Sequence, residues 1–403
     1  MANVSELKAV KTRFGGLSML DYTAYDLPTA HRMLGRHVGQ QVHKILKNKL
    51  DTWEEVRIRK MLAQAQSCIT LLAAKVADTR FDERLRKAIG EYLDCLSAWA
   101  DGAGLEHFEH PALADFQPLE QIDLAMFLQN DCSGCQTGMY RTEDGSVVLW
   151  HTEEDVEEQL GSGFDSLRIG EFNVGDKNHP VMMQAFNYPD LLPGPAFGWR
   201  SDGFAQAVDK LHIRHFPDLT AGILANVATW LTLRLGSVMD TTEIIESMQP
   251  YYDGYALNTV YSQAGRVQAH KYEFASDRII TTHLDEQPNS YLFQVNIFSN
   301  RSHPWVVELE DLHPDWCELY QQRVERTILA LQHKDGKPGA TGEMRFFFNM
   351  ITSQVGDDGW SYANRDVKAY FIHRQSLQGA ETWLGHGPAL PDDTIYVRIS
   401  QYD

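Results

Sequence analysis

The chain has 403 residues, of which 43% are apolar and 23% charged, a balance typical of a folded globular protein. Its 36 basic and 55 acidic side chains give a formal charge of -19, which repels a phosphate backbone and argues against nucleic acid as a partner. The N-terminus lacks the apolar stretch of a secretion signal, and no run approaches the roughly 20 apolar residues that span a bilayer. We therefore expect a cytoplasmic protein without a membrane or nucleic-acid partner.

Helical periodicity dominates the first third of the chain. Apolar residues recur at intervals of three and four from about Leu27 to Gly104, as at Val42, Ile45 and Leu46. Few Gly or Pro residues interrupt this pattern, so it predicts about three helices. A proline-containing stretch without a clear period follows, and residues 122–128 then indicate a short helix or turn.

The pattern changes at Cys135, after which short β-rich segments are separated by turn residues. The predicted strands lie at about residues 136–140, 145–150, 180–186, 266–272 and 291–298. Helical periodicity interrupts them at about residues 219–235, 242–248 and 316–331. Helices before and among antiparallel strands predict a layered α+β fold.

Five cysteines, at positions 68, 95, 132, 135 and 317, are an odd number spread thinly along the chain, so we expect free thiols. The close pair Cys132-Ser-Gly-Cys135 fits a redox pair, half of a zinc site, or two buried structural thiols. The β-like segment that follows disfavours the redox interpretation, and the sequence lacks a second motif to complete a zinc site.

A fourth interpretation rests on Gly134, directly before Cys135. A flexible Gly allows the strained backbone geometry in which the thiol attacks the preceding carbonyl. This acyl shift, followed by hydrolysis, would cut the chain between Gly134 and Cys135. The freed α-amine, with an ordinary pKa of about 7.7 to 8.0, can act as the base for the thiol of the same residue.

Two segments downstream carry a family resemblance. The turn Asp144-Gly145 leads through a strand into WHTEED at residues 150–155, and YPDLLPGPAFG at residues 188–198 is followed by DGFAQAVDKL at residues 202–211. Both resemble motifs of the penicillin acyltransferase family, which includes β-alanyl-amine hydrolases. Weaker similarities extend the resemblance from about residue 30 to residue 300, whereas the last hundred residues show little.

The resemblance implies a four-layer αββα sandwich, the N-terminal nucleophile hydrolase fold, in which two antiparallel sheets face each other between helices. It also implies two subunits from one precursor. Residues 1–134 would form a helical pro-segment or small subunit, and residues 135–403 the catalytic large subunit that starts at Cys135.

The family also implies site residues, with departures. An Asp supports the nucleophile in the family, and here Glu153, 18 positions after Cys135, or Glu154 must replace it. The position of the family's oxyanion-binding Asn holds Asp209, and an ionised Asp cannot donate a hydrogen bond. Either Asp209 is held protonated, another donor replaces it, or the activity is altered. Asn258 falls where relatives place a second polar residue, and it is equally well explained as a turn residue.

His151 lies beside these carboxylates at the end of a predicted strand. A lone His in this setting is more often a structural hydrogen-bonding residue than a base or a metal ligand, so we do not expect it to be catalytic.

The sequence thus predicts an autoprocessed amidohydrolase or acyltransferase that acts through a thioester on a small N-acyl amine or amino-acid amide. It needs no metal or redox cofactor, and an acyl thioester such as acyl-coenzyme A is a candidate co-substrate. One alternative is a catalytically silent relative that binds a ligand or partner, and another is a CxxC thiol oxidoreductase.

Overall fold

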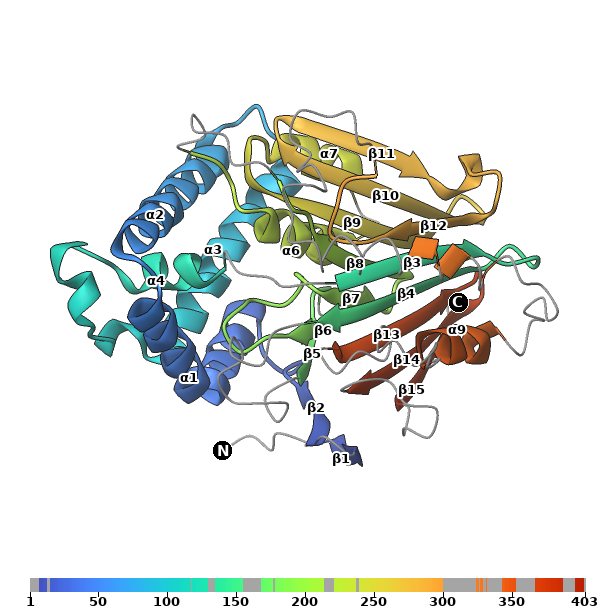
Figure 1. The fold of residues 1–403 in the computed structure, drawn as a ribbon, viewed down its shortest axis with the longest axis horizontal. Helices are drawn as coiled ribbons and strands as arrows, with labels where there is room; N and C mark the ends of the chain where they lie inside the picture. The colour runs from blue at the N-terminus through green and yellow to red at the C-terminus, as the bar shows by residue number, and fades with distance from the viewer. Residues whose placement is uncertain are drawn as a thin grey trace.

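The structure is a computed structural model that describes residues 7–12, 15–116, 118–129, 135–154, 168–176, 178–213, 221–236, 239–299, 343–352, 367–386 and 396–401, together with residues 324, 325, 327, 328 and 331. Two β-sheets lie face to face, and helices cover the outer faces (Figure 1). The α+β class predicted from the sequence is therefore confirmed.

The helical elements precede, interrupt and follow the strands in the chain. They are α1 (Leu27–Thr52), α2 (Glu55–Ala77), α3 (Glu83–Ala103), η1 (Leu105–His107), η2 (Pro111–Phe116), α4 (Gln121–Leu128), α6 (Ala225–Leu235), α7 (Thr241–Ser247), η5 (Leu284–Glu286) and α9 (Glu343–Thr352). The three predicted N-terminal helices are thus confirmed as α1 to α3. The helix predicted near residues 316–331 lies largely outside the described residues.

In the part of the chain that the structure describes, fifteen strands divide between the two sheets. They are β1 (Leu7–Thr12), β2 (Gly15–Asp21), β3 (Cys135–Arg141), β4 (Val147–Glu154), β5 (Arg168–Asn173), β6 (Met182–Asn187), β7 (Phe197–Arg200), β8 (Phe204–Lys210), β9 (Tyr251–Gln263), β10 (Arg266–Ser276), β11 (Arg278–His283), β12 (Tyr291–Gln294), β13 (Val367–Gln375), β14 (Gly379–His386) and β15 (Tyr396–Gln401). The nine-stranded sheet has the order β1-β2-β5-β6-β7-β8-β9-β10-β11, and the six-stranded sheet the order β12-β3-β4-β13-β14-β15.

Apolar clusters among the described residues define the layers. The largest joins α1 to α4, α6 and α7 to one face of the nine-stranded sheet. A second fills the space between the sheets, where Phe197 of β7 stacks on Phe371 of β13. A third joins the outer face of the six-stranded sheet to α9, where Trp150 stacks on Phe347. Both faces at the centre of each sheet are therefore buried by neighbouring layers.

Capping residues and apolar spacing account for the N-terminal helices. Asp26 caps α1 by accepting a hydrogen bond from the Thr29 amide, and Asp82 caps α3 in the same way. Gly104 ends α3 in the left-handed conformation, with φ of 73°, which Gly adopts without steric cost. The buried stripe of α1 includes Leu34, Val38, Val42 and Ile45.

Small residues let α1 and α3 cross at close range. A Cβ on Gly35 would lie 2.2 Å from the Trp99 carbonyl oxygen, and one on Gly102 would lie 2.1 Å from the Arg32 carbonyl oxygen. Any larger residue at either position would push the helices apart. Gly35 and Gly102 thus allow the two helices to pack closely.

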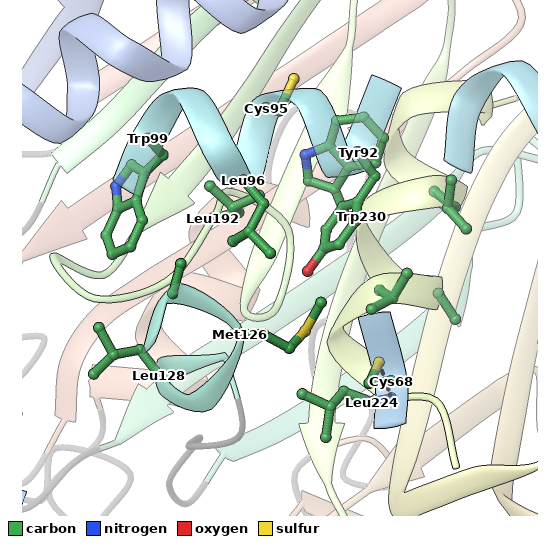
Figure 2. Close-up of a cluster of buried hydrophobic side chains, with 14 of the residues drawn as sticks. Cys68, Tyr92, Cys95, Leu96, Trp99, Met126, Leu128, Leu192, Leu224 and Trp230 are labelled. Carbon is green, nitrogen blue, oxygen red and sulfur yellow. Dashed lines mark hydrogen bonds between the residues drawn. The ribbon is translucent and has the colours of Figure 1, made fainter. Parts of the chain in front are cut away.

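The sequence predicts a helical segment over residues 1–134. This segment also contains two strands, because β1 and β2 form one end of the nine-stranded sheet. The β2 strand pairs in parallel with β5, which belongs to the second segment. Figure 2 shows that side chains from both segments share one core. Tyr92 contacts Trp230 with ring centroids 5.3 Å apart, and the Leu224 amide donates to Cys68 Sγ at 3.5 Å. The two segments are therefore parts of one packed unit.

The length and hydropathy of a helix decide whether it could cross a membrane. Among the helices of the described residues, none combines the length and the apolar character that crossing a bilayer requires.

Truncating Trp230 tests this shared core. The side chain is 1% exposed, so Trp230→Ala removes buried apolar contacts to both segments. We expect the free energy of unfolding to fall by about 3–5 kcal/mol. Urea denaturation followed by circular dichroism measures the change. Val56→Ala is the control, because Val56 is 76% exposed and should change the stability by less than about 0.5 kcal/mol.

Candidate active site

Cys135 is the first residue of β3 and is fully buried between the sheets. Its backbone N-H donates to Asn296 Oδ1 at 3.1 Å. The Asn296 Nδ2 in turn donates to the Lys210 carbonyl oxygen at 2.8 Å. Asn296 therefore ties the start of β3 to the end of β8 in the opposite sheet.

The register of β3 and β4 selects the acidic partner of Cys135. These antiparallel strands place Cys135 directly opposite Glu153. The Sγ atom lies 3.6 Å from both carboxylate oxygens, within reach of a weak S-H hydrogen bond. Glu154 ends β4 with its backbone paired to Val367, and its side chain lies outside the described part of the chain. Of the two Glu candidates, Glu153 thus occupies the partner position.

Two further side chains hold the Glu153 carboxylate. His151 Nε2 lies 2.7 Å from Glu153 Oε2, and the Tyr188 hydroxyl donates to Oε1. Thr137 Oγ1 lies 2.8 Å from His151 Nδ1. Because an ionised carboxylate only accepts hydrogen bonds, the Nε2 proton points at Glu153, whereas the direction of the bond between Thr137 and Nδ1 depends on the protonation of Nδ1. The carboxylate is therefore fixed in orientation by donors on two sides.

Strand alternation explains why these polar groups share one face. Successive side chains of β4 point to opposite faces, so His151 and Glu153 point inward while Trp150 points outward to α9. Opposite Trp150 lies Gly138, where a Cβ would meet the indole ring at 1.9 Å. The absence of a side chain at Gly138 makes room for this ring.

Asp209 and Asn258 lie on neighbouring strands of the facing sheet. Both are buried, and Asn258 Nδ2 donates to Asp209 Oδ2 at 3.0 Å. Asp209 Oδ1 receives no hydrogen bond from the described residues. Burial is the main cause that raises the pKa of Asp209 from 3.8 to about 7; His151, the Thr137 hydroxyl and Lys271 act to lower the pKa, and the Glu153 charge acts to raise it. A substantial fraction of Asp209 is therefore protonated near neutral pH and able to donate.

A buried cation lies on the same face of the nine-stranded sheet. Lys271 is paired with Asn258 across β10 and β9, and its Nζ lies 3.4 Å from Glu273 Oε2. It also donates to Gln294 Oε1 at 3.1 Å and to the Ser299 hydroxyl. Lys271 is thus held by partners and adds positive charge beside the Asp209 and Asn258 pair.

The structure therefore brings Cys135 and Glu153 together, and Asp209 and Asn258 together. Gly134 and Cys132 lie outside the described residues. Cys68, Cys95 and Cys135 are free thiols, as predicted for the cysteines. Sequence reasoning treated His151 as structural, and its bond to Glu153 agrees with a hydrogen-bonding role in the site itself.

Four contributors were not identified from the sequence: Thr137, Tyr188, Lys271 and Asn296. Tyr188 is the first residue of the segment YPDLLPGPAFG, so its place in this motif could have marked it as a candidate site residue. Asn296 lies 161 residues from Cys135 in sequence and has no local motif. Its contact with Cys135 follows from the antiparallel pairing of β12 with β3, whose register continues from Gln294 opposite Thr137.

Cys135, His151 and Glu153 also have the chemistry of metal ligands. Their donor atoms all lie within 4.8 Å of one another, and all three side chains are buried. Thiolate, imidazole and carboxylate are the usual ligand types of Zn²⁺.

Comparison with models of known protein families and with curated proteins finds no match to this chain.

Replacing Asp209 by Asn tests the pKa shift. With the pKa raised to about 7, wild-type stability is highest below the unfolded-state value of 3.8 and is lost progressively as the pH rises toward 7. Asp209→Asn removes this titration and keeps the shape. We expect the free energy of unfolding of the variant, relative to that of wild type, to rise by about 2 kcal/mol from pH 5 to pH 8. Urea unfolding at both pH values measures the difference, which should be absent for Asp277→Asn, a 72% exposed control.

Proposed function

We propose that the protein is a cysteine N-terminal nucleophile enzyme that cuts itself before Cys135 and then transfers or hydrolyses acyl groups of small amides. The observation that carries the proposal is the buried pair of Cys135 and Glu153 at the start of β3. Each carboxylate oxygen lies 3.6 Å from the thiol sulfur. A thiol held against an oriented carboxylate suits nucleophilic catalysis.

Self-cleavage would begin with attack of Cys135 Sγ on the Gly134 carbonyl carbon. The new S-C bond replaces the C-N bond, and the proton of the thiol ends on the released nitrogen. Water then hydrolyses the thioester, which leaves a carboxylate on Gly134 and a free amine on Cys135. Asn296 Oδ1, which accepts from the Cys135 N-H at 3.1 Å, is placed to accept from that amine.

Catalysis would repeat this chemistry on a substrate amide. The α-amine takes the thiol proton while Sγ attacks the substrate carbonyl, and the leaving amine then receives the proton. Glu153 balances the charge of the ammonium. Asn258 Nδ2 and the protonated form of Asp209 are the candidate donors to the oxyanion, although Asn258 donates to Asp209 at 3.0 Å and would have to turn.

The acyl-enzyme thioester then has two outcomes. Attack by water completes an amidohydrolase reaction, and attack by a bound amine completes an acyltransferase reaction. A small N-acyl amine or amino-acid amide is the proposed substrate class, and an acyl thioester such as acyl-coenzyme A is the candidate acyl donor for the transfer reaction.

The layered arrangement supports the finer fold assignment. Helices, the nine-stranded sheet, the six-stranded sheet and α9 follow one another in the order expected of the αββα sandwich. In this proposal residues 1–134 and 135–403 are the two subunits. Their shared core would keep them associated after the cut.

A catalytically silent binding protein is the second candidate function. Asp209 favours it, because the fraction that is ionised above a pKa of about 7 would repel a developing oxyanion. Failure of wild type to cleave itself would support this alternative.

Intact mass and N-terminal sequencing of purified wild type test the cleavage. We expect two chains, the larger beginning Cys135-Gln-Thr-Gly, and a single chain for Cys135→Ala. Cys132→Ala should still be cut, since the α-amine and thiol of Cys135 suffice. A single wild-type chain would contradict the proposal, and equal loss of cleavage in both variants would favour a paired CxxC function.

Tyr188→Phe tests the orientation of Glu153. Both Glu153 oxygens lie 3.6 Å from Sγ, so this carboxylate is placed to take the thiol proton at the start of self-cleavage. Tyr188→Phe removes one donor that orients it, a bond that contributes about 1.5–3 kcal/mol, so cleavage should slow about 10- to 100-fold. Time courses of precursor loss on denaturing gels measure the rate. Tyr251→Phe is the matched control, because its buried hydroxyl donates to the Ile245 carbonyl in the helical layer. Equal rates for wild type and Tyr188→Phe would argue against this role.

A further inference from the structure

The cluster of Cys135, His151 and Glu153 has a second chemical capacity. Within the described residues it is the sole group of three or more His, Cys, Asp or Glu side chains with donor atoms close enough to share an ion. All three side chains are fully buried, and the pairing of β3 with β4 fixes their positions. Ligands held in place by a sheet lose little freedom when an ion binds.

The separations suit a tetrahedral ion. Zn²⁺ lies about 2.3 Å from thiolate sulfur and about 2.1 Å from carboxylate oxygen, which places the two ligand atoms about 3.6 Å apart. The observed separation of Cys135 Sγ from the Glu153 oxygens is 3.6 Å. No movement of these two side chains is required.

The imidazole must move. His151 Nε2 lies 2.7 Å from Glu153 Oε2, because a proton joins them. Two such ligands of one Zn²⁺ need about 3.3 Å, so the ring must withdraw from Glu153 by several tenths of an ångström as the ion replaces that proton. Its nitrogen, which lies within 4.8 Å of Cys135 Sγ, must also come to about 3.6 Å from the sulfur. Thr137 Oγ1 can then accept a hydrogen bond from Nδ1-H, the kind of partner that orients metal-bound imidazoles.

We infer that the protein binds a thiophilic divalent cation such as Zn²⁺ at Cys135, His151 and Glu153. The thiol proton is released to solvent, the imidazole proton is exchanged from Nε2 to Nδ1, and no electron is transferred. Cleavage before Cys135 adds a fourth ligand, because the free α-amine and the thiolate of one Cys close a five-membered chelate ring. In the precursor this nitrogen is an amide that donates to Asn296 and has no lone pair for a metal.

The α-amine ligand rests on the proposed function, whereas the three side-chain ligands do not. In the mature enzyme the bound ion would occupy both the nucleophilic sulfur and the amine that relays its proton. The cation is therefore a reversible inhibitor, and a chelator should restore the free thiol.

Cobalt substitution tests the site. Chelator-treated protein kept reduced with a phosphine is titrated with Co²⁺, whose bond to a thiolate gives an intense near-ultraviolet charge-transfer band, and Zn²⁺ competition gives the affinity. We expect one ion per protein and a thiolate band that Cys135→Ala abolishes. Loss of a residue that only hydrogen-bonds a metal ligand lowers metal affinity about 10- to 100-fold. His151→Gln removes a ligand itself, so it should weaken Zn²⁺ binding at least ~10-fold.

His373→Gln is the matched control for His151→Gln. His373 is also fully buried in the six-stranded sheet. Its Nδ1 lies 2.9 Å from Thr382 Oγ1, and His151 Nδ1 lies 2.8 Å from Thr137 Oγ1 in the same type of contact. It does not belong to the cluster, so its replacement should leave the Zn²⁺ affinity unchanged. The absence of Co²⁺ binding, a band that survives in Cys135→Ala, or equal affinities for His151→Gln and wild type would each overturn the inference.

A fourth variant separates this inference from the proposed function. Gly134→Val is designed to block cleavage, and intact mass establishes the state of each sample. If wild type is cut and Gly134→Val is whole, wild type should bind Zn²⁺ at least ~10-fold more tightly, and equal affinities would overturn the amine ligand. If both are whole, the proposed cleavage fails, while a band that depends on Cys135 and an affinity that depends on His151 still support the three-ligand site.

Discussion

The candidate site depends on the antiparallel register of β3 and β4, which sets Cys135 opposite Glu153. A shift of one residue would turn every side chain of one strand to the other face, so the pair exists in this register alone. The outer face helps to hold it, because the Trp150 ring covers Gly138 and stacks on Phe347 with centroids 4.9 Å apart. Apolar packing beneath the sheet thus positions polar chemistry on its other side.

The space between the sheets gives two buried carboxyl groups different environments. Glu153 receives hydrogen bonds at both oxygens, from Tyr188 and His151, which stabilise its charged form. Asp209 accepts a hydrogen bond from Asn258 and is also stabilised in its charged form by the Thr137 hydroxyl, but burial outweighs these contacts and favours its neutral form. One carboxyl group is therefore suited to hold a cation and the other to donate a proton, and carboxyl pairs with such divided roles are common in enzyme sites.

Local patterns predicted the secondary structure well but could not supply long-range contacts. Periodicity located α1 to α3 and several strands, because each pattern reflects which side of one element is buried. The choice between Glu153 and Glu154 required the register of β3 with β4, and the contact of Asn296 with Cys135 required the pairing of β3 with the distant strand β12. The strands β1 and β2 were missed because they belong to the sheet through pairing with a distant partner, β5.

The parallel pairing of β2 with β5 also has a consequence for how the protein folds and refolds. The β2 strand and the helices before residue 135 are built into a sheet and a core that the rest of the chain completes. While the chain is continuous, these parts find each other at the high effective concentration that a covalent link provides. In the cut form that we propose, unfolding would set two polypeptides free, and their reassembly would depend on concentration. A molecule cut in this way would fold once as a precursor and would then persist through slow unfolding rather than through easy refolding.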